Sequence, residues 1–232
     1  SPQIAITPAD QWKEVDNRSL GSPVRDQKIY QTCSGCSTIT AFDIAMRKLN
    51  LTLPMLSFTY PYIKGGGGPR GALLSKVTQS FEEKGTCPEP YCPDYLILPS
   101  LLPPKADEMA TFKPAETTTN RLFSVEEMGT ALSKGAVLTA ITAVGPGINH
   151  PDSHGVIPIP DKAIGYHAWC VLSLSKLPEG ITSKLPWMFL VQSSWGKRWG
   201  SGGFGYLLAE HFDLFDRPVT SFAFWPGRQT GA

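Results

Sequence analysis

The sequence predicts an α+β protein in which a mainly helical N-terminal half packs against a mainly β C-terminal half. Helical spacing of apolar residues occurs before residue 135, and strand-like apolar runs follow it. The 232 residues are 41% hydrophobic and 18% charged, which is enough apolar material for a sizeable core. Helices followed by strands are typical of two packed halves, and a cleft between such halves is a common place for a site.

We expect a single domain spanning residues 1–232. Residues from about 20 to 105 form its helical half and residues from about 106 to 232 its β half. The lead-in, residues 1–19, is predicted to be extended and to cross to the β half. The chain contains no internal repeat and no low-complexity tail.

A long helix is predicted over about residues 34–50. Its apolar side chains recur at steps of three and four, as in Ile39, Phe42 and Met46. Cys36 therefore lies at a helix N-terminus, where unpaired N–H groups and the positive end of the helix dipole favour a thiolate. Because the thiolate is the nucleophilic form of cysteine, Cys36 is a candidate nucleophile.

Two more helices are predicted in the first 135 residues. Residues 72–84 carry an apolar face and end at Gly85, a typical helix stop. Residues 124–134 begin with a capping box and end at Gly135. The proline-rich segment 86–104 between them is predicted to be an irregular crossing.

The second half of the chain contains four strand-like apolar runs separated by glycine and proline. These runs are residues 136–144, 168–174, 187–191 and 203–208. His167 precedes the second run and Ser193 follows the third, so both place polar groups at strand ends, where active sites collect side chains. The other three histidines are expected at the surface.

Charge and hydropathy exclude several classes of partner. Lysine and arginine number 21 and aspartate and glutamate 20, so the net charge of +1 provides no global field for nucleic acid. The longest apolar-looking run, residues 136–144, is far shorter than the ~20 residues that span a bilayer. We therefore expect neither a nucleic-acid partner nor a membrane span.

No signal peptide is visible, and the compartment stays undecided, with some lean to a secreted or exported protein.

Several motifs resemble those of papain-type cysteine peptidases. Residues 23–27 with 33–36 match a P-V-x-x-Q…C-x-x-C segment. Residues 165–168 match a G-x-H-A histidine strand, and residues 193–196 with 200–206 match an S-W-G…G-x-x-G-x-G-Y segment. The order of nucleophile, histidine and orienting residue agrees, and His167 follows Cys36 at the separation typical of the family. Two further stretches are most similar to the bacterial branch of this family: GTCPEP, residues 85–90, and GFGYLLAEHF, residues 203–212. The resemblance covers nearly the whole chain and implies a papain-like fold.

The resemblance implies a role for each matching residue. Cys36 would be the nucleophile, and His167 would stabilise its thiolate and protonate the leaving amine. Gln27 would join the Cys36 backbone N–H in the oxyanion hole. Ser193 occupies the position of the asparagine that orients the histidine, and Trp195 would shield that histidine from water.

Substrate binding is also implied by the resemblance. Gly67 and Gly68 occupy the family's glycine pair, where an extended substrate backbone pairs; the alternative is a flexible surface loop. The chain departs from the family in having Ser37 where an aromatic residue normally follows the nucleophile. It also separates Gln27 from Cys36 by nine positions, about three more than usual, so residues 28–31 are predicted to form a small loop insertion.

The implied function is hydrolysis of peptide bonds in a polypeptide, through an acyl-enzyme, by a thiol endopeptidase without cofactor or metal. A propeptide or protein inhibitor would be a further partner. One alternative is a non-catalytic papain-like domain that binds peptides or proteins. Another keeps the same chemistry but acts as an amidase, isopeptidase or acyl transferase.

The remaining cysteines leave further alternatives open. Cys170 is predicted to be a buried free thiol. In the family Cys33 would carry a disulfide, but the usual partner position near residues 65–68 has no cysteine, so Cys87 or Cys92 could substitute. Cys33 and Cys36 could instead form a thioredoxin-like dithiol, and the four cysteines other than Cys170 could hold zinc.

Overall fold

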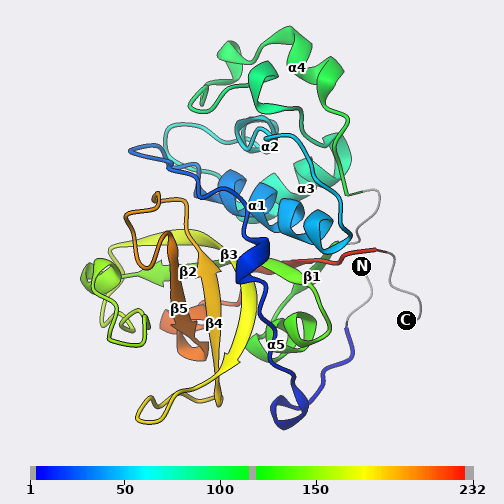
Figure 1. The fold of residues 1–232 in the computed structure, drawn as a ribbon. Helices are drawn as coiled ribbons and strands as arrows, with labels where there is room; N and C mark the ends of the chain where they lie inside the picture. The colour runs from blue at the N-terminus through cyan, green and yellow to red at the C-terminus, as the bar shows by residue number, and fades with distance from the viewer. Residues whose placement is uncertain (1–3, 115–118, 228–232) are drawn as a thin grey trace.

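The computed structural model describes residues 4–114 and 119–227. Helices α1 to α4 lie together in one part of the molecule, and the sheet with helix α5 forms the other part (Figure 1). The helices are α1 Cys33–Lys48, α2 Thr59–Lys64, α3 Leu74–Lys84, α4 Pro104–Met109 and α5 Val125–Ser133. Short 3-10 helices span Ala9–Gln11, Arg18–Leu20, Glu89–Tyr91, Pro99–Leu101, Pro146–Asn149, Ala209–Phe212 and Leu214–Asp216. The structure is therefore α+β, as the sequence predicts.

One antiparallel sheet of six strands, in the order β1-β6-β2-β3-β4-β5, forms the β part. The strands are β1 Thr119–Leu122, β2 Val137–Val144, β3 Gly165–Lys176, β4 Trp187–Gln192, β5 Phe204–Leu208 and β6 Ser221–Phe224. The four predicted runs become the adjacent strands β2 to β5. The register of β2 and β3 places His167 opposite Thr142, so this histidine lies near the end of the pair from which β3 begins.

Helix α1 is buried on almost all sides because it lies between the other helices and the sheet (Figure 1). Its residues Ile39 and Ile44 share a core cluster with Val137 of β2 and Leu172 of β3. Ser37, which stands where an aromatic residue was expected, accepts a 2.7 Å hydrogen bond from the Thr139 hydroxyl. Ser37 therefore joins α1 to the sheet.

The N-terminal segment lies against the β part of the molecule. Val15 pairs with Leu174 of β3, and the ring centroids of Trp12 and Trp187 are 6.0 Å apart. The Thr7 backbone N–H donates to the Thr130 hydroxyl of α5. The segment thus adds its apolar side chains to the core that the sheet and α5 share.

We expect Gly129→Ala to destabilise the fold, because a Cβ atom at this position would lie 2.1 Å from the Trp12 ring. Trp12 cannot easily move: it is buried and its indole N–H donates to Thr7. Overpacking costs about 1–3 kcal/mol, which outweighs the ~1 kcal/mol that alanine gains over glycine in a helix. Urea denaturation would measure the loss, with Glu126→Ala on the exposed side of α5 as a control. Unchanged or increased stability would contradict the prediction.

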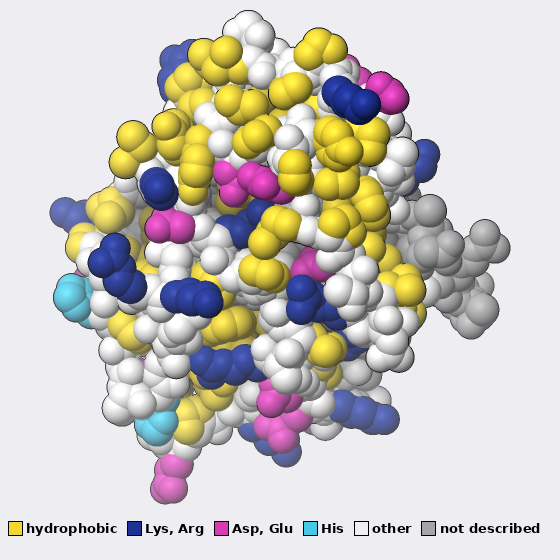
Figure 2. All heavy atoms as spheres, turned by 45° about the horizontal axis from the view of Figure 1, so that its top comes forward, with side chains coloured by type: hydrophobic (Ala, Val, Ile, Leu, Met, Phe, Trp, Pro, Cys, Tyr) yellow, Lys and Arg dark blue, Asp and Glu magenta, His cyan; other side chains and the backbone are white. Residues whose placement is uncertain are grey.

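The surface mixes charges of both signs, in agreement with the balanced composition. Figure 2 shows lysine, arginine, aspartate and glutamate interspersed on one face, with hydrophobic side chains gathered mainly in its upper half. Among the described helices, none combines the length and apolar character that crossing a membrane requires.

Candidate active site

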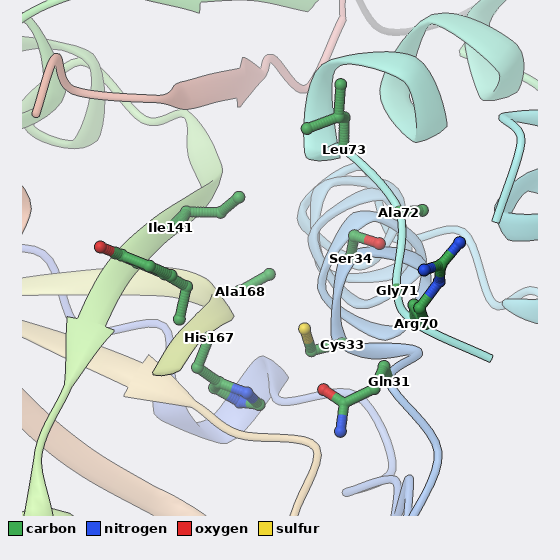
Figure 3. Close-up of a pocket in the computed structure, with 11 residues that line it drawn as sticks. Gln31, Cys33, Ser34, Arg70, Gly71, Ala72, Leu73, Ile141, His167 and Ala168 are labelled. Carbon is green, nitrogen blue, oxygen red and sulfur yellow. The ribbon is translucent and has the colours of Figure 1, made fainter. Parts of the chain in front are cut away.

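A cleft of about 440 Å³ separates the N-terminal end of α1 from strands β2 and β3. In Figure 3 one wall carries Gln31, Cys33 and Arg70 from the helical part, and the opposite wall carries Ile141 and His167 from the sheet. The full lining is Gln31, Cys33, Ser34, Arg70, Gly71, Ala72, Leu73, Ile141, Tyr166, His167 and Ala168. A thiol and an imidazole thus face the same space from two different halves of the fold.

Cys33 is the first residue of α1 and lines the cleft. The preceding Thr32 makes no side-chain cap, so the helix does not satisfy its first N–H groups in that way. Unpaired N–H groups and the positive end of the helix dipole stabilise negative charge at this point. Cys33, rather than Cys36, therefore lies both at the N-terminal end of α1 and in the cleft.

Cys36 lies one turn further along α1, inside the core. It is 1% exposed and packs in the apolar cluster that contains Ile39 and Val137. Burial raises the pKa of its thiol to about 12. The predicted nucleophile is thus outside the cleft that His167 lines, because three residues advance the helix by ~4.5 Å and move the side chain from the helix end into the interior.

The spacing of the sequence also favours Cys33 over Cys36. Cys33 follows Gln27 by six positions, which is the usual family spacing, so no insertion at residues 28–31 is needed. Ser34, not Ser37, then follows the cleft cysteine. Neither of the two possible Cys33 disulfides forms: in the described residues, which include all five cysteines, every thiol is free, and Cys87 and Cys92 lie in a different core cluster.

His167 is held in an aromatic enclosure. Its ring stacks on Trp195 at 3.8 Å between centroids, and the edge-on ring of Trp169 lies at 4.5 Å. The side chain of His167 is only 3% exposed. Trp195 therefore covers one face of the imidazole and restricts the access of water to it.

Ser193 lies next to the imidazole. Its Oγ is 3.4 Å from Nε2 of His167, and its backbone N–H donates to Gly203. The neighbouring Gln192 points to the other side of the strand, where its amide donates to the Ser22 carbonyl. Ser193 is thus in reach of the histidine, at the long end of hydrogen-bond distances.

Gln27 is fixed by hydrogen bonds at both ends of its side-chain amide. Its Oε1 accepts from the Ser194 hydroxyl at 2.6 Å, and its Nε2 donates to the Tyr30 carbonyl at 2.7 Å. Its backbone N–H donates to the Ser194 carbonyl. Ser194 therefore anchors the loop that leads from Gln27 to Cys33.

Gly67 and Gly68 do not line the cleft. A Cβ atom on Gly67 would lie 2.5 Å from the Tyr62 ring, so this glycine permits close packing. The Gly68 carbonyl accepts from the Tyr62 hydroxyl, and its N–H donates to Gly71. The tight turn formed by this pairing brings residues 70–73, rather than the glycine pair, to the cleft wall.

Comparison with solved structures identifies the fold. Xylellain, a cysteine protease from Xylella fastidiosa, superposes with a TM-score of 0.76 over 97% of this chain and 91% of its own, at 17% identity. The bromelain protease from Ananas comosus gives 0.70 at 16% identity over 93% and 99%. A clostridial cysteine protease, Cwp84, gives 0.71 at 15% identity over 90% and 56%. The chain has a papain-like fold. No protein-family model and no curated protein matches the sequence.

Within this papain-like fold, burial disfavours charge on both cleft groups. It raises the pKa of the Cys33 thiol above its ordinary value and lowers the pKa of His167 to about 3. The Cys33 thiol and the His167 imidazole are therefore both uncharged near pH 7. A neutral imidazole has an unprotonated ring nitrogen, so His167 is in the form that a general base requires.

We expect His167 to make the folded state sensitive to acid. Its pKa is about 3 when folded and ~6.5 when unfolded, so the unfolded state binds the additional proton as the pH falls below 6.5. Between pH 6.5 and 4.5 this lowers the free energy of unfolding by roughly 2–3 kcal/mol. Denaturant titrations of the wild type and His167→Gln at both pH values would isolate this contribution. The same pH dependence in both proteins would contradict it.

Two alternative uses of the cysteines find no support in the described residues. Within ranges 4–114 and 119–227, no three histidine, cysteine, aspartate or glutamate side chains are placed to hold a metal ion. The Cys33–Cys36 pair follows a turn and loop at residues 28–32, not the strand that a thioredoxin-like motif would require.

Ser194, Tyr166 and Arg70 were not predicted as site residues, and Cys33 was predicted only as part of a disulfide, a dithiol or a zinc site. Its six-residue separation from Gln27 is the signal that points to the cleft. His211, which was expected at the surface, is instead buried, and its Nδ1 accepts the Leu208 N–H.

Proposed function

We propose that this protein is a cysteine peptidase in which Cys33 is the nucleophile and His167 the general base and acid. The observation that carries the proposal is the arrangement of these two groups on opposite walls of one cleft, with Ser193 beside the imidazole. The likeness to cysteine proteases of the same fold supports a hydrolase.

Acylation would begin when the Cys33 sulfur attacks the carbonyl carbon of a peptide bond and its proton passes to His167. The carbonyl oxygen becomes an oxyanion, and the donors proposed for it are the backbone N–H of Cys33 and the second N–H of the Gln27 amide, whose first N–H donates to the Tyr30 carbonyl. His167 then gives its proton to the leaving nitrogen. The carbon–nitrogen bond breaks, and a thioester joins the substrate acyl group to Cys33.

Deacylation would restore the free enzyme. Water attacks the thioester carbon while His167 takes one of its protons, and the carbon–sulfur bond breaks. The proton returns to the Cys33 sulfur as the carboxylic acid leaves. Trp195, stacked on the imidazole, would limit other routes by which His167 could exchange its proton with bulk water.

Ser193 is expected to position His167 rather than to touch substrate. Loss of its hydroxyl in Ser193→Ala should lower kcat by roughly tenfold, because a 3.4 Å contact is a weak hydrogen bond. Ser193→Asn should leave kcat equal or raise it, since an amide oxygen reaches further. Steady-state kinetics with one peptide would measure both. A large loss of kcat in a folded Ser193→Asn protein would contradict a purely orienting role.

The direct test of function is hydrolysis of internally quenched peptides under reducing conditions. We expect turnover by the wild type, with new termini identified by mass spectrometry. Binding of peptides without cleavage, by a protein whose thiols are reduced, would favour a non-catalytic binding domain instead.

One of the similar structures is described as a protease after propeptide cleavage, which supports a propeptide as a further partner.

A further inference from the structure

The cleft continues beyond Cys33 and His167 into a second cavity of about 140 Å³. Leu73, Ile141 and Tyr166 line both cavities, so the two form one trough along the junction of α3 and the sheet. Leu73 and Tyr166 are 69% and 47% exposed, which leaves their surfaces free for a bound chain. An extended peptide held at Cys33 could therefore place neighbouring residues in this trough.

Three arginines line the trough, and none of the described residues that line it is an aspartate or a glutamate. Arg70 lies at the cavity that contains Cys33, and Arg121 and Arg217 lie at the second cavity. All three are exposed. Within the described residues, none of these guanidinium groups has a carboxylate within 4.0 Å, since the ion pairs present involve other residues.

Two of the guanidinium groups are held by aromatic rings. Arg217 lies over the Tyr166 ring at 4.0 Å, and Arg121 lies over Phe123 at 4.9 Å. Contact with a ring face orients a guanidinium group and leaves its N–H edge available for a carboxylate. Asp216 is adjacent to Arg217 in sequence but forms no ion pair with it, and Asp213 pairs with Lys184 instead.

We propose that the trough recognises acidic side chains of the substrate. This inference rests on the proposed function: the substrate would be a polypeptide with aspartate or glutamate close to the scissile bond, on the side that lies along the trough. The whole chain has a net charge of only +1, so the attraction is local to this surface. Arginine binds carboxylates through paired, charge-assisted hydrogen bonds, which glutamine in the same place cannot reproduce.

The test compares quenched peptides that differ only in glutamate or glutamine at each of four positions on either side of the bond. We expect roughly tenfold higher kcat/KM for glutamate at one or two positions on one side, and a smaller preference at high ionic strength. Arg121→Gln with Arg217→Gln should remove most of the preference, and Arg217→Lys should keep part of it. Lys105→Gln, which removes one positive charge on α4 outside the trough, should change nothing.

Binding separates this inference from the proposed function. Fluorescence anisotropy with the Cys33→Ala protein measures the affinity for the same glutamate and glutamine peptides without any chemistry. Equal affinities and equal rates, or a preference that survives in the folded double arginine variant, would overturn the inference. Preferential binding of the glutamate peptide without turnover by the wild type would uphold it and overturn the peptidase assignment.

Discussion

Cys33→Ala is expected to abolish peptide hydrolysis, with a loss of roughly 10⁴-fold or more in kcat, whereas Cys36→Ala should retain activity within a few-fold. The reason is that removal of a nucleophile eliminates the acyl-enzyme route. Cys36 packs in the core and does not line the cleft. Steady-state hydrolysis of one quenched peptide by both variants would measure the difference.

The two cysteine variants control for each other. Both remove one sulfur from the same turn of α1, so a loss that came only from damage to the helix would appear in both. Cys36→Ala should cost the fold about 1 kcal/mol, because it removes a small buried hydrophobic group. Activity that survives in Cys33→Ala and disappears in a folded Cys36→Ala protein would contradict the assignment.

His167→Ala is expected to produce the second large effect. Without the base, kcat should fall by roughly 10³-fold or more. Burial raises the pKa of Cys33, and without a neighbouring base to take its proton the thiol stays protonated at neutral pH. Its alkylation by iodoacetamide should therefore be slow at pH 7 and should increase as the pH rises beyond 9, the direction expected for an isolated buried thiol.

The wild type should behave differently on the acid side. Since the pKa of His167 is about 3, the imidazole stays unprotonated, the form that a general base requires, from neutral pH down to the onset of acid unfolding. Alkylation of the wild type should accordingly be faster than that of His167→Ala at every pH between 5 and 8. Matching pH profiles for the two proteins would show that His167 does not act on Cys33.

Much of the fold could be predicted from periodicity. The helix at the centre of the molecule and strands β2 to β5 agree with the predicted ranges to within a few residues, because each has a strong apolar pattern. Strands β1 and β6 have only four residues each, which is too short for a pattern to be distinguished from a loop. Their pairing with each other joins segments about 100 residues apart, which local sequence does not reveal.

The site was harder to predict than the fold. The motifs of His167 and Gln27 each contain only one residue of the required type, whereas two cysteines lie within one turn of α1. Helical periodicity places both cysteines at the start of a helix, and only the packing of that helix shows that Cys36 lies in the core. The arginine trough could not be predicted, because its residues come from the α2–α3 connection, β1 and the segment before β6.

The most direct test of the account is intact-mass and peptide-mapping mass spectrometry after treatment of the reduced protein with E-64, an epoxide that alkylates papain-type cysteines. Wild type, Cys33→Ala, Cys36→Ala and His167→Ala would be treated in parallel. We expect a single adduct on Cys33 that is absent in Cys33→Ala, retained in Cys36→Ala and slow to form in His167→Ala. An adduct on Cys36, or no adduct in a folded and reduced wild type, would contradict the account.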